Sequence, residues 1–219
     1  MISLSEENYL KAIYQEGIIV GNVSTNNIAN RLNTKAASVT EMLHKLSDKK
    51  LIKYKPYQGV SLTEKGQKLA LAVIRKHRLW EFFLVNNLKF KWDEVHEIAE
   101  QLEHIQSDSL IDKLAEYLGN PKFDPHGDPI PDKNGKIATL NAKSLNNFKH
   151  NSKLTLRGVA QSDTLFLQYL DSIGLKIGSS FLLKEFISYD GSAHLLINSK
   201  TSVFVSPVIA KNLLVSENE

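Results

Sequence analysis

The stretch "KAASVTEMLHKLSDKKLIKYKPYQGVSLT", residues 35–63, decides the fold of the N-terminal part of the chain. Four of its apolar residues recur at the i, i+3, i+4, i+7 spacing of one helix face, namely Val39, Met42, Leu43 and Leu46. This spacing predicts an amphipathic helix from about 35 to 47. Two short alternating runs follow, at 51–55 and 60–63, and the "PYQG" between them favours a turn, so we expect a β-hairpin.

Helical patterns flank this stretch on both sides. We expect a first helix over residues 5–16 behind a Ser5 cap, and a second of about two turns behind Ser24. Thr63 is placed to cap a long helix from about 64 to 85. The order helix, short helix, helix and hairpin predicts a winged helix-turn-helix.

Charge is divided unevenly along the chain. Residues 31–78 hold 12 Lys or Arg against 3 Asp or Glu, whereas residues 93–132 hold 2 against 11. The basic segment indicates a module that meets a polyanion such as double-stranded DNA. The acidic segment is typical either of a cation site or of a solvated acidic face.

A winged helix-turn-helix brings the start of its recognition helix closest to the base edges. The outward candidates there are Lys35, Ala37, Ser38 and Glu41. Phosphate contacts are expected from the wing and its surroundings, namely from Arg31, Lys53, Lys55 and Tyr57. The alternative is that these lysines only keep a small helical domain in solution.

Histidines and carboxylates gather on the acidic side of the chain. If one helix runs from about 94 to 105, four of them share one face, namely His96, Glu100, Glu103 and His104. His77 and Glu81 lie one turn apart on the preceding helix. Packing the two faces together would crowd carboxylates, and a divalent cation is the simplest way to satisfy them. An exposed acidic face is the alternative.

The ligand types limit both the metal and the chemistry. The chain has no cysteine, which excludes disulfides and sulfur-ligated zinc or iron–sulfur sites. Nitrogen and oxygen ligands suit Mn²⁺ or Fe²⁺, with Zn²⁺, Co²⁺ or Ni²⁺ as substitutes in vitro. Residues 64–131 hold no Glu-x-x-His, and the chain has no His-Glu-x-x-His, G-x-S-x-G or phosphate-binding glycine loop. We therefore expect a structural or regulatory site, not an enzyme, and no small organic substrate.

The remainder of the chain predicts a change of fold class. A helix capped by Ser107 follows the acidic helix, and residues 121–153 are rich in Pro, Gly, Asn and Lys, as in a linker. Residues 154–216 hold strand-like runs with one helix, "SDTLFLQYLDSI", which predicts a small β-barrel-like domain. With no apolar run of 18 residues and no signal segment, we expect a cytoplasmic protein that does not meet the membrane.

Four segments together resemble one protein family. "SEENYLKAIY", "RKHRLWE", "VHEIAEQLEH" and "DPHGDPIP" resemble the diphtheria-toxin repressor family of metal-dependent transcriptional regulators, which includes a manganese-sensing branch. The similarity covers roughly residues 3–131, and the tail is more loosely similar to the family's SH3-like or FeoA-like third domain. The resemblance implies a mainly α protein with a β C-terminal domain, divided into a winged helix-turn-helix, a helical metal-binding and dimerisation domain, a linker and the SH3-like/FeoA-like domain, at residues 1–63, 64–131, 132–153 and 154–219.

The resemblance also implies a mechanism and two metal sites. In the family, metal binding in the dimer-forming domain orients two winged helices, so that a homodimer holds a palindromic operator near metal-uptake genes. One site is implied for His77, Glu81 and His96, completed from the third domain, where Asp163 is the candidate. The other is implied for Glu100, Glu103 and His104, together with Asn8 of the first helix.

Three positions depart from the family pattern. Asn8 stands where the family often has Asp or Met, so any coordination there is uncharged. Lys11 stands where the two-metal manganese sensors have Glu. Glu100 replaces the Cys of the iron-sensing branch and favours a harder ion, so we expect manganese in preference to iron. Two other hypotheses stay open: a regulator whose metal is purely structural, and a metalloenzyme with a borrowed DNA-binding module.

Overall fold

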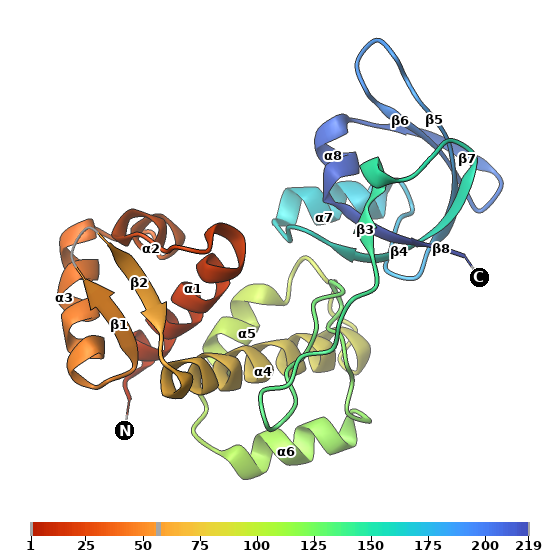
Figure 1. The fold of residues 1–219 in the computed structure, drawn as a ribbon. Coiled ribbons are helices and arrows are strands. Elements are labelled where there is room, and N and C mark those ends of the chain that lie inside the picture. The colour runs from red at the N-terminus through yellow and green to blue at the C-terminus, as the bar shows by residue number, and fades with distance from the viewer. Residues whose placement is uncertain (1, 56–57, 219) are drawn as a thin grey trace. The chain divides into compact units, whose positions relative to one another are not determined.

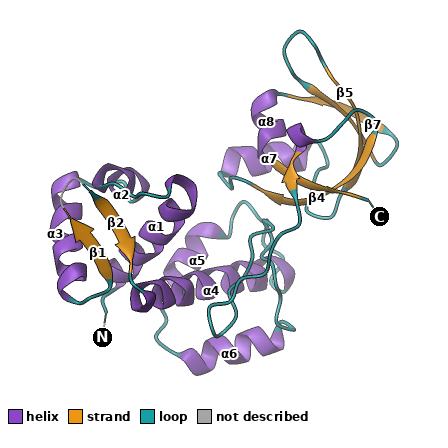
Figure 2. Cartoon of the chain, in the orientation of Figure 1, coloured by secondary structure: helices purple, strands orange, loops and turns teal. Residues whose placement is uncertain are grey.

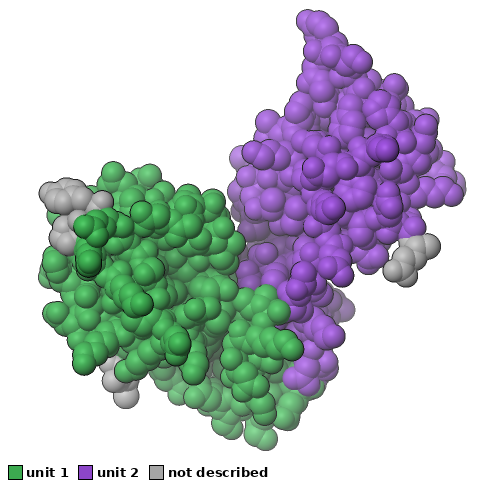
Figure 3. Space-filling view, in the orientation of Figure 1, with its two compact units in different colours: residues 1–77, 100–116, 131–137 green, residues 78–99, 117–130, 138–219 purple. Residues whose placement is uncertain are grey.

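The structure is a computed structural model that describes residues 2–55 and 58–218. Its contacts divide the chain into two compact units (Figure 3). The first unit holds residues 1–77, 100–116 and 131–137, and the second holds 78–99, 117–130 and 138–219. No helix among the described residues is long and apolar enough to cross a membrane.

The N-terminal elements form the winged helix-turn-helix that the sequence predicts (Figure 1). They are α1 (Leu4–Val20), α2 (Thr25–Arg31), α3 (Ala36–Asp48), β1 (Ile52–Lys55) and β2 (Gly59–Leu62). The two strands pair antiparallel, and the apolar stripe of α3 packs into one core with α1 and the hairpin. Buried members of that core include Leu10, Ile28, Val39, Leu43 and Leu46.

The start of the first helix differs from the expectation. α1 is capped by Ser3, not by Ser5, because the Ser3 hydroxyl accepts from the Glu6 amide while the Glu6 carboxylate accepts from the Ser3 amide. This reciprocal capping box satisfies two amide groups at once, which a cap at Ser5 would leave to solvent. The helix also continues past Gly17 to Val20.

Three helices follow the wing: α4 (Glu64–Asn86), α5 (His96–Leu102) and α6 (Asp108–Tyr117). The prediction of one helix from about 94 to 105 is wrong at both ends. The amide of Ile105 bonds to the carbonyl of Leu102 at 3.2 Å, a tight turn that ends α5 and places Glu103 and His104 beyond it. These two side chains therefore do not continue a helical stripe from His96.

The C-terminal part is an antiparallel sheet with two helices, in keeping with the predicted SH3-like/FeoA-like fold class (Figure 1). Its strand order is β3-β8-β4-β5-β6-β7. The elements are β3 (Lys143–Ser144), the 3₁₀ helix η1 (Leu145–Asn147), β4 (Ser152–Val159), α7 (Thr164–Ser172), β5 (Ser180–Phe186), β6 (Ala193–Ile197), β7 (Thr201–Val205), α8 (Pro207–Asn212) and β8 (Leu213–Glu217).

Part of the segment expected to be a linker belongs to this sheet. β3 pairs with β8, and Leu145 of η1 is fully buried in the core of the C-terminal part. Residues 118–142 between α6 and β3 are drawn as loop (Figure 2) and carry only an isolated bridge between Phe123 and Pro129. That loop is nevertheless pinned to β4, since the Val159 amide donates to the His126 carbonyl at 3.0 Å.

Candidate metal centre

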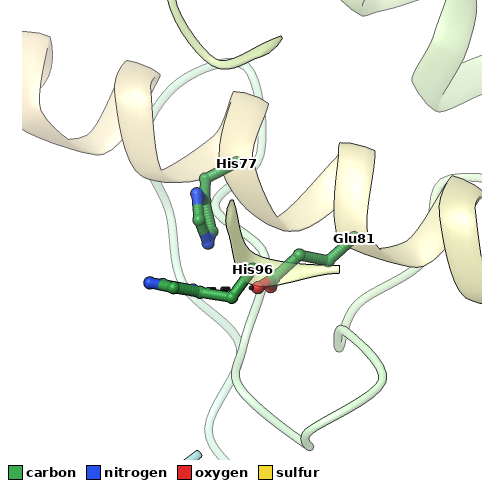
Figure 4. Close-up of side chains that lie close together, drawn as sticks. All are labelled: His77, Glu81 and His96. Atoms are coloured by element: carbon green, nitrogen blue, oxygen red, sulfur yellow. Dashed lines mark hydrogen bonds and ion pairs between the residues drawn. The ribbon is translucent and has the colours of Figure 1, made fainter. Parts of the chain in front are cut away.

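The first predicted cluster is assembled around Glu81. His77 and Glu81 lie one turn apart on the continuous helix α4, and His96 begins α5. Nδ1 of His96 lies 3.4 Å from Oε1 of Glu81. Figure 4 shows the three side chains together, and one ligand atom of each lies within 4.8 Å of the others. His77 and Glu81 are buried, whereas the side chain of His96 is 56% exposed, so solvent reaches the cluster from that side.

A second cluster, which the sequence reasoning missed, shares Glu81. Its Oε2 lies 3.7 Å from Nδ1 of His126, and Asp124 Oδ1 lies 3.9 Å from the same nitrogen. Glu81, Asp124 and His126 are all buried, and their ligand atoms lie within 4.8 Å of one another. Both new residues belong to "DPHGDPIP", a segment that carries the family resemblance but in which we predicted no ligand.

Trp92 orients the ring of His126. Nε2 of His126 lies 2.9 Å from the Trp92 carbonyl oxygen, and its ring stacks on the indole at 6.1 Å. A carbonyl only accepts, so Nε2 carries the proton, and Nδ1 is left facing the two carboxylates. Histidines that bind metals usually donate one ring N–H to a carbonyl or carboxylate, which leaves the other nitrogen for the ion. His126 has this arrangement, with Nδ1 facing the acidic oxygens.

The electrostatics of this second cluster favour a cation. Burial and the neighbouring carboxylates of Glu81 and Asp128 raise the pKa of Asp124 to about 7. Burial acts to lower the pKa of His126, but the adjacent Glu81 and Asp124 outweigh it and raise that pKa to about 9. Crowded buried carboxylates therefore retain positive charge on His126, and a divalent ion can take its place.

Glu103 is the centre of the third cluster. It is fully buried, and its Oε2 lies 2.6 Å from both Lys11 Nζ and His77 Nδ1. Lys11 Nζ also donates to Glu100 Oε1 at 2.6 Å. The structure thus brings Glu100 and Glu103 together as predicted, but around an ammonium group from α1 that the sequence reasoning treated only as a departure from the family.

His104 points away from that ammonium and towards Glu7. Its Nδ1 lies 2.6 Å from Glu7 Oε2, while its Nε2 lies 3.9 Å from Glu103 Oε1. Gln106 Nε2 donates to the other Glu7 oxygen at 2.9 Å. The sequence reasoning missed Glu7, because no local pattern distinguishes it from the other acidic residues at the start of α1.

Two buried oxygens without hydrogen-bond partners show whether the residues at α1 fit a metal ion. Glu103 Oε1 and Asn8 Oδ1 are buried and have no hydrogen-bond partner among the described residues. Leaving a buried carboxylate oxygen without a partner is costly, so Glu103 Oε1 calls for a cation, whereas the neutral amide oxygen of Asn8 can accept from a donor or coordinate an ion without adding charge. Two ligand atoms that each lie about 2.1 Å from one ion are at most about 4.2 Å apart. Glu103 Oε1 and His104 Nε2 lie 3.9 Å apart, so one ion can bind both. The residues fit a hard or borderline divalent ion.

The remaining predicted ligand lies elsewhere. Asp163 caps α7, where its side chain accepts from the Phe166 amide at 3.0 Å. Its side chain is exposed and belongs to none of the three clusters that the described residues form.

The predicted DNA contacts are exposed where the structure describes them. Ala37, Ser38 and Glu41 face solvent on α3, and Lys35 immediately precedes that helix. Lys53 and Lys55 face solvent on β1, and Arg31 at the end of α2 pairs with Glu16 at 2.5 Å. Tyr57 lies outside the described residues.

Comparison with sequence models of protein families gives three matches. Residues 1–60 match the N-terminal DNA-binding domain of iron-dependent repressors, and residues 63–132 match their metal-binding and dimerisation domain. Residues 143–217 match the FeoA domain.

Individual relatives cover the chain to different extents. It is 37% identical over 128 residues to the iron-dependent repressor IdeR of Mycobacterium tuberculosis, a match that takes in 57% of this chain and 54% of IdeR. The chain thus spans about half the length of the curated relatives it matches. Two solved structures match at 33% identity: a manganese-dependent transcriptional repressor in complex with manganese, with TM-score 0.87 over 97% of this chain and 100% of the other, and the manganese regulator SloR, with TM-score 0.76 over 97% and 98%.

Proposed function

This chain belongs to the diphtheria-toxin repressor family of metal-dependent transcriptional regulators, and we propose that it represses metal-ion uptake and homeostasis genes in response to manganese or ferrous iron. The observation that carries the proposal is the unpartnered buried oxygen Glu103 Oε1, which lies 3.9 Å from Nε2 of His104. Nδ1 of that histidine lies 2.6 Å from Glu7 of α1, so these contacts join the metal-binding region to the first helix of the DNA-binding domain. Since the relatives are repressors, the metalloenzyme alternative is set aside.

We propose manganese in preference to ferrous iron. All three clusters offer only carboxylate oxygen and imidazole nitrogen, and the chain has no sulfur ligand from cysteine. Hard oxygen ligands suit Mn²⁺ more than the softer divalent ions. Relatives with manganese in their names match nearly the full chain. Zn²⁺, Co²⁺ and Ni²⁺ are expected to bind in vitro.

The proposed switch acts between α1 and the turn after α5. Glu7 fixes the Nδ1–H tautomer of His104, so its Nε2 and Glu103 Oε1, which lie 3.9 Å apart, are both available to an ion. Asn8, on the same helix as Glu7, stays a proposed further ligand. A bound divalent ion supplies the positive charge that these atoms lack. Holding α1 against the turn removes hinge freedom from the winged helix. A difference of about 3 kcal/mol between the metal affinities of the competent and open arrangements changes operator affinity roughly 100-fold.

The second proposed site lies at Glu81. Its carboxylate is shared by the cluster with His77 and His96 and the cluster with Asp124 and His126. We assign ligand roles at this second site to Glu81 and to its neighbours in both clusters. Asp163 stays a proposed ligand only for a rearranged C-terminal domain, since its side chain now caps α7.

The proposed partners are double-stranded DNA and a second copy of the chain. Recognition helices of a homodimer, one DNA turn apart, would read a two-fold-symmetric operator. The predicted domain division, 1–63, 64–131, 132–153 and 154–219, remains part of this proposal. The proposed DNA contacts are Arg31, Lys35, Ala37, Ser38, Glu41, Lys53, Lys55 and Tyr57.

The experiment that tests the proposal is recovery of genomic DNA fragments by the chelator-stripped protein at fixed salt, with Mn²⁺, with Fe²⁺ under anaerobic conditions, or without metal. Salt is fixed because phosphate contacts alone would otherwise mimic specific binding. Enrichment of a few fragments only with metal is expected, and Glu103→Gln should abolish it. Glu97→Gln, an exposed carboxylate on α5, is the matched control. Equal enrichment with and without metal would mean that the metal is purely structural.

A further inference from the structure

We propose that the ammonium group of Lys11 is a resident cation of the metal centre, which closes the cluster of His77, Glu100 and Glu103 to metal and limits the site beside α1 to one divalent ion. The inference rests on the proposed function, because it concerns the number of divalent ions that the proposed site binds. It goes beyond the proposed function by giving a definite role to Lys11, which is not itself a ligand.

The geometry places Lys11 where an ion would sit. His77, Glu100 and Glu103 offer ligand atoms within 4.8 Å of one another, as a metal site does. Lys11 Nζ contacts all three: it lies 2.6 Å from an oxygen of each carboxylate and 3.3 Å from His77 Nδ1. Two N–H groups of the ammonium bond the two carboxylates, whereas His77 Nδ1 itself donates to Glu103 Oε2 at 2.6 Å and lies beside the ammonium without accepting from it.

Burial makes this contact strong. The side chain of Lys11 is 8% exposed and that of Glu103 is 0% exposed, so neither charge is well hydrated. A buried charge needs an opposite charge and complete hydrogen bonding, and short ammonium–carboxylate bonds provide both. Removing Lys11 would leave Glu103 as an uncompensated buried charge, which is why metal would have to replace it.

The two oxygens of Glu103 then have separate tasks. Oε2 is occupied by Lys11 and His77, whereas Oε1 has no hydrogen-bond partner among the described residues and faces His104 Nε2 at 3.9 Å. A pair of divalent ions bridged through the two oxygens of Glu103 would need Oε2 free of Lys11. With Lys11 in place, only Oε1 is open to a metal ion, and the carboxylate is held in position before any metal arrives.

The test counts bound manganese in a Glu81→Gln background, which disables the clusters that share Glu81. Equilibrium dialysis against Mn²⁺ should give one ion per chain with Lys11 present and two with Lys11→Met. The two ions should appear as a spin-coupled pair in electron paramagnetic resonance, because Glu103 would bridge them. Lys11→Arg, which keeps the charge, and Lys65→Met, an exposed lysine of α4, should both retain one ion.

Stability provides a second readout that does not depend on the ion count. Without metal, Lys11→Met should lower the thermal midpoint of unfolding by several degrees. Adding Mn²⁺ should raise the midpoint of Lys11→Met by more than it raises the midpoint of the protein with Lys11 intact. One ion in both proteins together with equal metal-free midpoints would overturn the role of Lys11.

The Glu81→Gln protein with Lys11 intact tests the proposal even if Lys11→Met fails to fold. A spin-coupled manganese pair in the Glu81→Gln protein with Lys11 intact would show that metal displaces the ammonium, which also overturns the proposal. Absence of any bound manganese in that protein would instead refute the proposed function, so the two failures are distinguishable.

Discussion

Nδ1 of His104 lies 2.6 Å from Oε2 of Glu7, although the two residues are 97 positions apart in the chain. A carboxylate only accepts, so this contact places the imidazole proton on Nδ1 and leaves the lone pair of Nε2 facing Glu103. A residue of the DNA-binding domain thus prepares a ligand of the proposed metal site. The same carboxylate–histidine arrangement raises the basicity of ligating histidines in general.

Glu7→Ala should therefore weaken manganese binding without removing a ligand. We expect a loss of about 10- to 100-fold in affinity, the usual effect of deleting a residue that orients a ligating histidine. Titration calorimetry of the chelator-stripped protein with Mn²⁺ measures it. Glu64→Gln, an exposed carboxylate in the first turn of α4, is the control and should bind like the parent. Unchanged affinity in Glu7→Ala would mean that His104 needs no orienting partner.

Gly127 holds the loop of the second cluster against β4. Its φ is +88°, and an added Cβ would lie 2.3 Å from the Arg157 carbonyl oxygen and 2.4 Å from Gly158 Cα. Both contacting atoms belong to the backbone of β4, so they cannot move aside as a flexible side chain could. Gly127→Ala should force the loop away from β4, displace the adjacent His126 and lower both stability and metal affinity at Glu81.

Gly119 provides the matched control for that substitution. It has a similar φ of +75°, but nothing lies within 4 Å of an added Cβ. Gly119→Ala should cost only the backbone strain of about 1–2 kcal/mol, whereas Gly127→Ala should cost clearly more. Urea unfolding followed by circular dichroism compares the two, and equal losses would show that the loop does not need its close approach to β4.

The winged helix was predictable from sequence because its signals are local. The stripe of Val39, Leu43 and Leu46 fixes the buried face of α3, and the Pro-Tyr-Gln-Gly segment predicts the break between two short strands, although Gly59 itself belongs to β2. The shifted start of α1 was harder to foresee. Ser3 and Ser5 both precede the helix, and only the reciprocal bond with Glu6 selects Ser3.

The metal centre was predictable only in part, because its geometry depends on distant contacts. Glu100, Glu103 and His104 lie in one region as predicted, but the predicted helix that was to align them ends at Leu102. Beyond that end, Glu103 turns to Lys11 and His104 turns to Glu7, both on α1. No periodicity within the acidic segment encodes partners so far away in sequence. Asp124 and His126 lie in a loop, where side chains follow no helical or strand periodicity, so no spacing in the sequence predicted them as ligands.

Trp92 connects the second cluster to the C-terminal domain. Its indole Nε1 donates to Asp171 Oδ2 on α7 at 3.2 Å, while its carbonyl holds His126. Trp92→Phe should destabilise the protein by about 1–3 kcal/mol, because it leaves a carboxylate oxygen without its donor. Trp80→Phe is the control, since Trp80 Nε1 is buried and has no hydrogen-bond partner among the described residues. Urea midpoints measure both, and a loss as large for Trp80→Phe would contradict the role of the Asp171 bond.

Glu6 should make the metal-free protein sensitive to acid. Burial acts to raise the pKa of this carboxyl, but Lys49 at 2.7 Å, the Ser3 amide and Lys45 lower it from 4.5 to about 2. The folded pKa lies below the unfolded one, so the contribution to the free energy of unfolding is complete above about pH 4.5 and is lost as the pH falls towards 2. It amounts to at most about 3 kcal/mol. Glu6→Gln should remove this dependence, so the difference in unfolding free energy between the parent and Glu6→Gln, measured with urea in chelator, should shrink as the pH falls from about 5 towards about 3. In that range the unfolded chain takes up the proton while the folded protein still resists it. A constant difference between the two proteins across that range would show that Glu6 does not titrate there.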